Sequence, residues 1–490
     1  MQKFTFFISI LSLMLLGMGC NNGNDTKHIY IISTNDVHAT IEAMPKLATV
    51  VEEYESKGEV ILVDSGDRVT GNAYVDDATH PGVPIIELMN DVGYDVVTLG
   101  NHEFDKGRNA LNAMVDASDF EWVCCNLEDI VGESKIKPWT TISVAGIEIC
   151  FVGVVDTDQD GRPLGGESSY VDFRFTPDVE SASNISALPN SDFTVLLSHM
   201  GHERDIRLAE STSTYDWIAG GHSHDIFNNI VAGTHISQNN KNIRYITIAD
   251  LTVSDGAIVN VSYEQIKTSE VSNNEHISAL VEEIRASDLE LNTVEAMVTS
   301  PATKEGVSNF TIQALATYPY ADGFVPEITF YHYGGVRLDG FAEGELKRVD
   351  ILNNDPFVST IYVGELTAQQ IEEFILTKYN NGTPENVDKE SHYPYFRSDM
   401  EYTIVLEDEP EERPDALYLK HNLEPRSYRV ALCNYVAENY IDKAIVEAQL
   451  HDTGTTVRKA MLRYIRTFAK EGYTPDNVTR QHEVRAAELQ

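Results

Sequence analysis

The chain has 490 residues and a formal net charge of −41, with 36 Lys and Arg against 77 Asp and Glu. This acidic excess argues against DNA or RNA as a polymeric partner, because phosphate backbones are bound by clustered Lys and Arg. It does not exclude a small phosphorylated ligand, which metal ions and one or two arginines can hold locally. The length exceeds that of one ordinary hydrophobic core and predicts two domains.

The N-terminus has the pattern of an export signal. Lys3 precedes an apolar and small-residue run, Phe4 to Gly19, that ends at Cys20. The run is short for a permanent membrane span, which needs about 20 apolar residues. It therefore predicts a secretory signal over residues 1–20 and no transmembrane helix in the mature protein.

The end of this run, Gly17-Met18-Gly19-Cys20, resembles a bacterial lipoprotein processing site. The resemblance implies lipid anchoring at Cys20, with residues 21–27 as a polar tether. It also implies an exported protein at the periplasmic face of a membrane, at the outer membrane or on the cell surface. A simple cleaved signal with an incidental Cys is the alternative.

From residue 28 to residue 268, apolar strand-like runs alternate with polar turns and amphipathic helices. This alternation predicts an α/β layered domain. The run Ile61-Leu62-Val63 is uninterrupted, as expected of a strand covered on both faces. The predicted strands are Ile29–Ser33, Val60–Val63, Asp95–Leu99, Trp122–Cys125, Ile147–Val155, Phe193–Leu197, Trp217–Ala219 and Arg244–Ile248. The predicted helices are Lys46–Lys57 and Pro84–Val92.

The second half of the chain has a different composition. Residues 269–300 predict a connection that contains a helix over Glu275–Glu290. From residue 301 to residue 490, aromatic residues are frequent and no second His and Asp cluster occurs. Helices are expected over Ser308–Thr317 and Ala368–Tyr379, so this part predicts a separate α+β domain.

Polar clusters rich in His, Asp and Asn follow five of the strand-like runs of the first domain. They are Asp36-Val37-His38, Asp64-Ser65-Gly66-Asp67, Gly100-Asn101-His102-Glu103-Phe104-Asp105, Ser198-His199 and Gly221-His222-Ser223-His224. Each cluster alone is common in turns, but the carboxyl ends of the strands in such a sheet open onto one crevice. Together they predict one site that holds two divalent metal ions. The mixed N and O ligands suit Zn²⁺, Mn²⁺ or Fe.

This set of clusters resembles the calcineurin-like metallophosphoesterases and, among them, the secreted 5′-nucleotidase / UDP-sugar hydrolase family. The resemblance implies an N-terminal four-layer metallophosphoesterase β-sandwich flanked by helices, followed by a 5′-nucleotidase-like C-terminal substrate domain. The metal ligands that it implies are Asp36, His38 and His224 for one metal, Asn101, His199 and His222 for the other, and Asp67 for both. Asp64 is expected to be a supporting hydrogen-bond acceptor.

The remaining residues of the third cluster suggest the chemistry. Two metals about 3.5–4 Å apart can activate a bridging water, and the resulting hydroxide attacks phosphorus in line. His102 follows the ligand Asn101 and can reach the same phosphate, while Asp105 can hold its imidazole and raise its pKa. The pair is therefore predicted to stabilise transition-state charge or assist the leaving oxygen. We expect Gly100 to let the backbone turn, and Glu103 to serve packing.

Two motifs of the second domain resemble the substrate motifs of the same family. Gly334-Gly335-Val336-Arg337 implies Arg337 as a phosphate partner, and Asp355-Pro356-Phe357 implies Phe357 as a ring that stacks on a nucleobase. A buried core aromatic is the alternative for Phe357. Other motifs depart from the family, because His332 replaces an asparagine and the segment around Tyr440 replaces a glycine-rich one. Tyr440 is the expected substitute for the second stacking aromatic.

The sequence thus predicts a dinuclear-metal phosphohydrolase that cleaves phosphate from nucleoside 5′-monophosphates. The same chemistry on another phosphoester, such as a 2′,3′-cyclic nucleotide, a UDP-sugar or a non-nucleotide ester, stays open because the base-recognition motifs depart from the family. An alternative of another class is a non-enzymatic surface lipoprotein that binds nucleosides or a partner. The open ligand set argues against it, since structural metal sites are normally closed.

Overall fold

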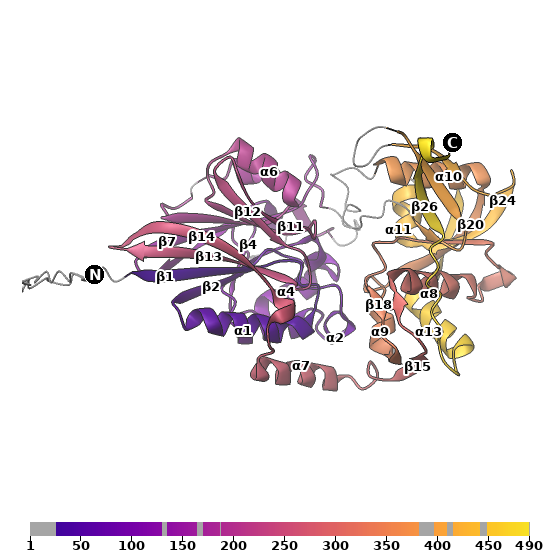
Figure 1. The fold of residues 1–490 in the computed structure, drawn as a ribbon, viewed down its shortest axis with the longest axis horizontal. Helices are drawn as coiled ribbons and strands as arrows, with labels where there is room; N and C mark the ends of the chain where they lie inside the picture. The colour runs from indigo at the N-terminus through magenta and orange to yellow at the C-terminus, as the bar shows by residue number, and fades with distance from the viewer. Residues whose placement is uncertain are drawn as a thin grey trace, which may run out of the picture.

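The computed structural model describes residues 26–129, 135–163, 170–186, 188–381, 396–408, 415–441 and 448–489. The predicted export signal with Cys20 and most of the tether lie outside the described residues. Among the described residues, no helix combines the length and the apolar character needed to span a bilayer. The chain forms two units that lie side by side (Figure 1), coloured indigo to magenta and orange to yellow.

The N-terminal unit is built, within the described residues, on two six-stranded sheets. The first has the order β14-β13-β1-β2-β3-β4, with strands β1 Lys27–Thr34, β2 Glu59–Asp64, β3 Val96–Thr98, β4 Glu121–Val123, β13 Tyr245–Ser254 and β14 Ala257–Lys267. The second has the order β11-β12-β10-β9-β7-β6, with strands β6 Trp139–Val144, β7 Ile147–Val155, β9 Phe193–His199, β10 Trp217–Gly220, β11 Ile226–Val231 and β12 Thr234–Asn239.

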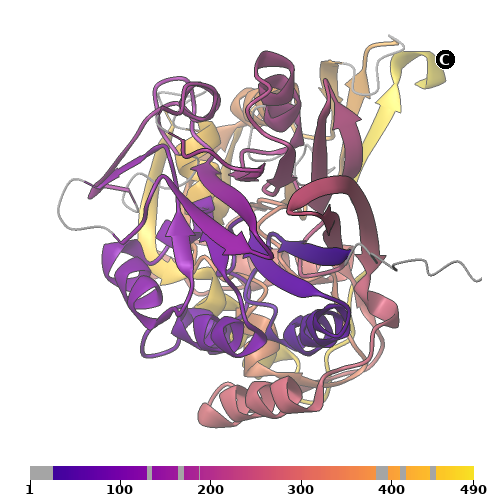
Figure 2. The same cartoon turned by 90° about the vertical axis from the view of Figure 1, so that its left-hand side faces the viewer.

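The two sheets pack face to face and helices cover their outer faces, so the unit has four layers. The core between the sheets contains Ile31, Ile61, Phe151 and Val195. Figure 2 looks onto this unit and shows indigo and purple helices along one side and a magenta helix on the other. Helices α1 Met44–Glu55, α3 Val83–Val92 and α4 Gly107–Ala117 pack on the first sheet, and α5 Asp178–Ser183 and α6 His202–Ser211 pack on the second. The predicted α/β sandwich is confirmed.

The pairing of the strands explains why the ligand clusters share one edge. Strands β1, β2, β3 and β4 run parallel, and so do β7, β9, β10 and β12. Their apolar residues are buried on both faces, as in a sheet covered by two layers. Every predicted ligand loop follows the carboxyl end of one of these strands, where an α/β sheet opens.

Helix α7 Glu275–Ser287 leads from the first unit to the second and lies along the lower side of the molecule in Figure 1. Asn274 caps its first turn by accepting a hydrogen bond from the backbone of Ile277 at 3.1 Å. The helix buries Ile277 and Val281 against the core of the first unit. Strand β15 Val294–Val298, within the segment predicted as a connection, already pairs with β19 Gly344–Lys347.

The C-terminal unit is centred on a five-stranded sheet of order β21-β17-β24-β20-β25. Its strands are β17 Ile328–Tyr331, β20 Thr360–Thr367, β21 Arg397–Ser398, β24 Ser427–Cys433 and β25 Gln449–Thr456. The helices α8 Lys304–Ala316, α10 Ala368–Asn381 and α13 Val457–Phe468 belong to the same unit, together with a three-stranded sheet of β22 Tyr402–Leu406, β23 Ala416–Lys420 and β26 Gln481–Arg485. Strands and helices are mixed irregularly here, which confirms the predicted α+β class.

The two units are in direct contact beside the predicted site. The Asn353 side chain, at the end of helix α9 Arg348–Leu352, accepts a hydrogen bond from the backbone of Ala73 at 2.7 Å. An ion pair also joins Arg458 of α13 to Asp77. These contacts hold the loops of the second unit against the edge where the ligand clusters gather.

Candidate metal centre

The structure brings the predicted metal ligands together at the carboxyl edge of the two sheets. All of them are buried, with exposed fractions of 0 to 9%: Asp36, His38, Asp67, Asn101, His199, His222 and His224. They form two adjacent groups. We call Asp36, His38 and His224 with the shared Asp67 the first pocket, and Asn101, His199 and His222 with the shared Asp67 the second pocket.

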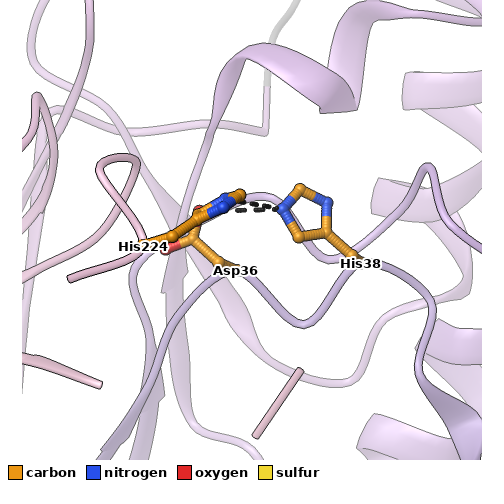
Figure 3. Close-up of side chains that lie close together, drawn as sticks. All are labelled: Asp36, His38 and His224. Carbon is orange, nitrogen blue, oxygen red and sulfur yellow. Dashed lines mark hydrogen bonds and ion pairs between the residues drawn. The ribbon is translucent and has the colours of Figure 1, made fainter. Parts of the chain in front are cut away.

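In the first pocket, two imidazoles and a carboxylate converge. Nε2 of His38 and Nε2 of His224 lie 3.0 Å apart, and Oδ1 of Asp36 lies 3.2 Å from the same His224 nitrogen. Figure 3 shows these three side chains pointing toward one another. Two ligands held about 2.1 Å from one tetrahedral Zn²⁺ lie roughly 3.4 Å apart, so this spacing fits a shared cation.

The second pocket has similar spacing. Nε2 of His199 lies 3.1 Å from Oδ2 of Asp67, and Nδ1 of His222 lies 3.1 Å from Oδ1 of Asn101. On its other side, Nδ1 of His199 faces the carbonyl oxygen of Ser65 at 2.7 Å and therefore carries the proton. In its neutral form, His199 then directs the lone pair of Nε2 at the pocket, which is how a second partner orients a metal-binding imidazole.

The backbone around these ligands is strained. Five of the seven predicted ligands have positive φ values, from 46° at His38 to 80° at His222. Residues other than glycine rarely adopt this region, and it costs of order 1–3 kcal/mol at each position. Such strain concentrates at functional sites, because only surrounding contacts can maintain it.

Glu103 supplies some of those contacts, although the sequence suggested only packing. Its carboxylate accepts hydrogen bonds from the backbone amides of Asp67 at 3.0 Å, Arg68 at 2.9 Å and Gly100 at 2.5 Å. The loop after β2 and the loop after β3 are thereby tied together. Asp64 has the expected supporting role, since it accepts hydrogen bonds from Gly66 at 3.0 Å and from the buried Arg68 at 3.0 Å.

The expectation that Gly100 is needed to let the backbone turn was wrong. Its backbone is extended, with φ −109° and ψ −177°, which any residue adopts. A Cβ at this position would instead lie 2.2 Å from Oδ1 of Asp67 and 2.5 Å from its backbone nitrogen. Glycine is required because the two ligand loops approach each other closely, and not because the chain turns.

The charges of the site favour a cation. Burial would lower the pKa of His199, but the carboxylates of Asp67, Asp36 and Asp156 outweigh it and hold that pKa well above its ordinary value. Burial and the nearby Arg337 hold the pKa of His38 well below its ordinary value, so its imidazole is neutral. Neutral imidazoles and ionised carboxylates are the forms that bind divalent metals. The residues present therefore fit the metal ions that the fold implies.

His102 and Asp105 lie beside the two pockets. Oδ2 of Asp105 is 2.7 Å from Nδ1 of His102 and also accepts a hydrogen bond from the Thr70 hydroxyl at 2.7 Å. Because an ionised carboxylate only accepts, Nδ1 carries a proton and Nε2 faces the site, 3.8 Å from Oδ2 of Asp67. Burial would lower the pKa of His102, but Asp67 and Asp105 outweigh it and raise that pKa to about 9.

Asp156 is a further carboxylate at this edge that the sequence did not single out. It follows the last residue of β7, and its Oδ1 lies 4.0 Å from Nδ1 of His222. Burial raises the pKa of its carboxyl above the ordinary value. The signal was present in the sequence, because Asp156 directly follows the run Ile147–Val155 just as the other clusters follow theirs.

Two of the predicted substrate residues reach across from the C-terminal unit. Nη2 of Arg337 lies 3.2 Å from both ring nitrogens of His38. The ring of Phe357 lies 5.8 Å from the ring of His102 and remains 40% exposed. Phe357 is therefore not a buried core aromatic. The next residue, Val358, has a φ of 56°, which is unusual for a β-branched residue.

The third predicted substrate residue, Tyr440, lies in the core of the C-terminal unit. It is 7% exposed, and the ammonium of Lys378 donates a hydrogen bond to its hydroxyl at 3.1 Å. Its ring packs edge-on against Phe396, with the centroids 5.1 Å apart. The ring of Tyr435, whose centroid lies 5.9 Å from that of Tyr440, is only partly buried and packs against the ring of His332, with the centroids 4.6 Å apart.

Two family profiles match the chain in the order that the fold suggests. The family described as calcineurin-like phosphoesterase matches residues 29–225, and the family described as 5′-nucleotidase, C-terminal domain, matches residues 286–442. The first match covers the strands and loops that carry the predicted ligands. The second covers the loops of Arg337 and Phe357.

Individual relatives agree with these matches. The trifunctional nucleotide phosphoesterase protein YfkN of Bacillus subtilis is 25% identical over 473 residues, which cover 83% of this chain and 31% of YfkN. A 5′-nucleotidase of Vibrio parahaemolyticus is 27% identical over 294 residues, covering 50% of this chain and 52% of the relative. The chain thus spans about a third and about half of the lengths of these two relatives.

The fold has a counterpart among solved structures. The crystal structure of a 5′-nucleotidase precursor from Thermus thermophilus superposes with a TM-score of 0.76 at 16% sequence identity, covering 93% of this chain and 99% of the other. Both units and their order are therefore shared. The chain therefore combines a calcineurin-like phosphoesterase domain with a 5′-nucleotidase C-terminal domain, in that order.

Proposed function

We propose that the protein is a metal-dependent phosphohydrolase that removes phosphate from nucleoside 5′-monophosphates. The observation that carries the proposal is the convergence of buried imidazole, carboxylate and amide ligand atoms in two adjacent pockets that share Asp67. An imidazole that is not a predicted ligand, His102, stands beside them and is held by a carboxylate. Such an arrangement supplies both a binding site for phosphate and a group that can move a proton.

The proposed cofactors are two divalent cations, one in each pocket, and Zn²⁺, Mn²⁺ and Fe suit the ligands. When bound, they lower the pKa of a coordinated water and bind the phosphoryl oxygens. Asp36 and Asp67 offset two of the four positive charges, so the site keeps a net positive charge for an anionic substrate. This local charge operates despite the net charge of −41 on the whole chain.

His102 has the position expected of an acid or a transition-state stabiliser. Asp105 and Thr70 fix the imidazole so that its Nε2 faces the site. A protonated His102 would donate a hydrogen bond to a phosphoryl oxygen or to the leaving oxygen as negative charge develops there. Its proton would then pass to the departing nucleoside.

Arg337 and Phe357 are proposed to select the substrate. The guanidinium of Arg337 offers the bidentate geometry that phosphate oxygens prefer. The exposed ring of Phe357 can stack on a base, a contact worth about 1–3 kcal/mol. Both lie at the mouth of the site because the loops of the second unit are held there by the contacts of Asn353 and Arg458.

The test is phosphate release from AMP by protein that has been depleted of metal and then supplied with Mn²⁺ or Zn²⁺. We expect release only with added metal, and its loss in Asn101→Ala and His102→Ala. The matched control is His28→Ala, because His28 lies at the opposite end of β1 in an ion pair with Asp250. Equal rates in the wild type, Asn101→Ala and His102→Ala would contradict the proposed site.

The burial of Tyr440 favours a second candidate, the same chemistry on another phosphoester. With Tyr440 in the core, Phe357 lacks its expected stacking partner and discrimination for nucleotides is weakened. A panel of AMP, a 2′,3′-cyclic nucleotide, a UDP-sugar and a phenyl phosphate distinguishes the two. Preference for AMP supports the first candidate, and full activity on phenyl phosphate without preference for nucleotides supports the second.

We also propose that the protein is exported and anchored by lipid at Cys20. The apolar run before Cys20 and its small residues support this. Mass spectrometry of the mature N-terminus in a bacterial host tests it. A diacylated Cys20 as first residue is the expected result, and an unmodified terminus at another residue would contradict the anchor while leaving the enzymatic proposal intact.

A further inference from the structure

Asp156 stands at the same edge of the second sheet as the predicted ligands. The preceding residue, Val155, ends β7 and is in register with His199 on the parallel strand β9. Oδ1 of Asp156 lies 4.0 Å from Nδ1 of His222. Two imidazoles of the second pocket, His199 and His222, thus lie close to this carboxylate.

The carboxylate is buried without a hydrogen-bond donor. Asp156 is 0% exposed, and within the part of the chain that the structure describes no donor reaches either of its side-chain oxygens. Arg204 is near enough to act on the Asp156 carboxylate electrostatically. Its guanidinium donates hydrogen bonds to Asp178 and to the carbonyl oxygen of Thr157 instead. A buried carboxylate that accepts no hydrogen bond is costly to ionise, and a cation bound beside it would offset that cost.

The predicted ligands distribute negative charge unevenly between the two pockets. The first pocket has a carboxylate of its own, Asp36, in addition to the shared Asp67. The second pocket has only the shared one, because its other ligands are an amide and two imidazoles, which carry no charge when they bind a metal. With Asp156 included, each pocket has one carboxylate of its own and one that is shared.

We propose that Asp156 is the second pocket's own carboxylate: it balances one positive charge of the divalent cation held there and raises the affinity for that cation. The inference rests on the proposed metal-dependent function but concerns a residue outside the predicted ligand set. The proposed role requires no contact between Asp156 and the substrate. It is a positioning residue that acts through the cation and through His222.

The test is the affinity for Mn²⁺, measured by calorimetry on metal-depleted protein. We expect two binding events in the wild type, and Asn101→Ala identifies the event that belongs to the second pocket. Asp156→Asn keeps the shape of the side chain and removes its charge. It should weaken that same event about 10- to 100-fold, the loss typical of partners just outside the ligands, and leave the other event within about twofold.

The matched control is Asp205→Asn in helix α6. Asp205 is also 0% exposed and also has a side-chain oxygen without a hydrogen bond, but its carboxylate accepts from Ser198 at 2.5 Å. We expect Asp205→Asn to leave both Mn²⁺ events unchanged. Equal Mn²⁺ affinities in the wild type and Asp156→Asn would overturn the inference alone. A wild type that binds no divalent cation would overturn the proposed function as well.

A second measurement does not depend on how the variant folds. In crystals of the wild type soaked with Mn²⁺, anomalous scattering locates the cation of the second pocket. An Asp156 oxygen within about 5 Å of that cation, the range of direct or water-mediated binding, supports the inference. A greater distance, or a side chain turned to another partner, overturns it.

Discussion

The two units differ in how far they bury their predicted functional side chains. The N-terminal unit buries all seven predicted metal ligands and holds five of them at positive φ. The C-terminal unit offers Arg337 and the 40% exposed ring of Phe357 at its surface, while the third predicted substrate residue, Tyr440, is part of its core. If the proposed function is correct, the reaction would depend on buried ligands held in an unfavourable backbone conformation, whereas the choice of substrate would depend on a few surface contacts.

The strongest test of this contrast is removal of the shared ligand by Asp67→Ala. Both pockets lose a carboxylate at once, so we expect both cations to be lost. Phosphate release from AMP should fall by more than the roughly 10⁴-fold upper limit typical of a single acid–base group. Metal analysis of the purified variant beside the activity assay checks this. A variant that keeps two cations and most of its activity would show that Asp67 is not shared.

The next effect concerns His102→Ala, which should separate chemistry from metal binding. We expect kcat on AMP to fall about 10²- to 10⁴-fold, with the metal content unchanged, because His102 is not a predicted ligand. Steady-state kinetics and metal analysis on the same preparation measure both quantities. Loss of metal in this variant would instead assign His102 to the metal site.

In the C-terminal unit, Arg337→Ala should have a smaller effect that falls on substrate binding. Charge-assisted hydrogen bonds contribute about 1.5–3 kcal/mol, so kcat/KM for AMP should fall roughly 10- to 150-fold. Arg337→Lys should retain only part of the wild-type kcat/KM, since a point charge does not reproduce the bidentate contact. Full recovery with lysine would mean that only the charge matters.

The smallest effect is expected from Phe357→Leu. The ring is 40% exposed, and the expected second stacking ring, Tyr440, is buried in the core, so the loss of Phe357 should cost about 1 kcal/mol, the lower end for base stacking. KM for AMP should rise roughly fivefold, while KM for glycerol phosphate, which has no ring, should stay the same. An equal change for both substrates would contradict a role in recognising the base.

The sequence predicted the N-terminal unit well because its signals are local. Each ligand cluster follows a continuous apolar run, and parallel strands bring the ends of such runs to one edge. The predicted helix over Ser308–Thr317 also exists, although α8 begins earlier, at Lys304, where Thr303 caps the first turn. Edge strands such as β14 were missed, because their exposed polar residues interrupt the apolar pattern.

The features of the site that could not be predicted from the sequence depend on contacts between distant segments. The role of Glu103 depends on backbone amides 35 and 36 residues away, which no local pattern shows. Asp156 is not part of a recognisable motif, and only its burial beside the ligands distinguishes it from other Asp residues that follow strands. The burial of Tyr440 under Lys378 likewise depends on tertiary packing, so a motif position alone did not place its ring.

The carboxylate of Glu103 has a consequence for the choice of metal. By joining the backbone of Asp67 to that of Gly100, it fixes how far the loop of the shared ligand lies from the loop of Asn101. A cation of different radius must then adapt to a spacing that the protein sets. We therefore expect that selectivity among Zn²⁺, Mn²⁺ and Fe depends in part on an acid outside the predicted ligand set, and that Glu103→Gln alters the metal preference while the predicted ligands stay the same.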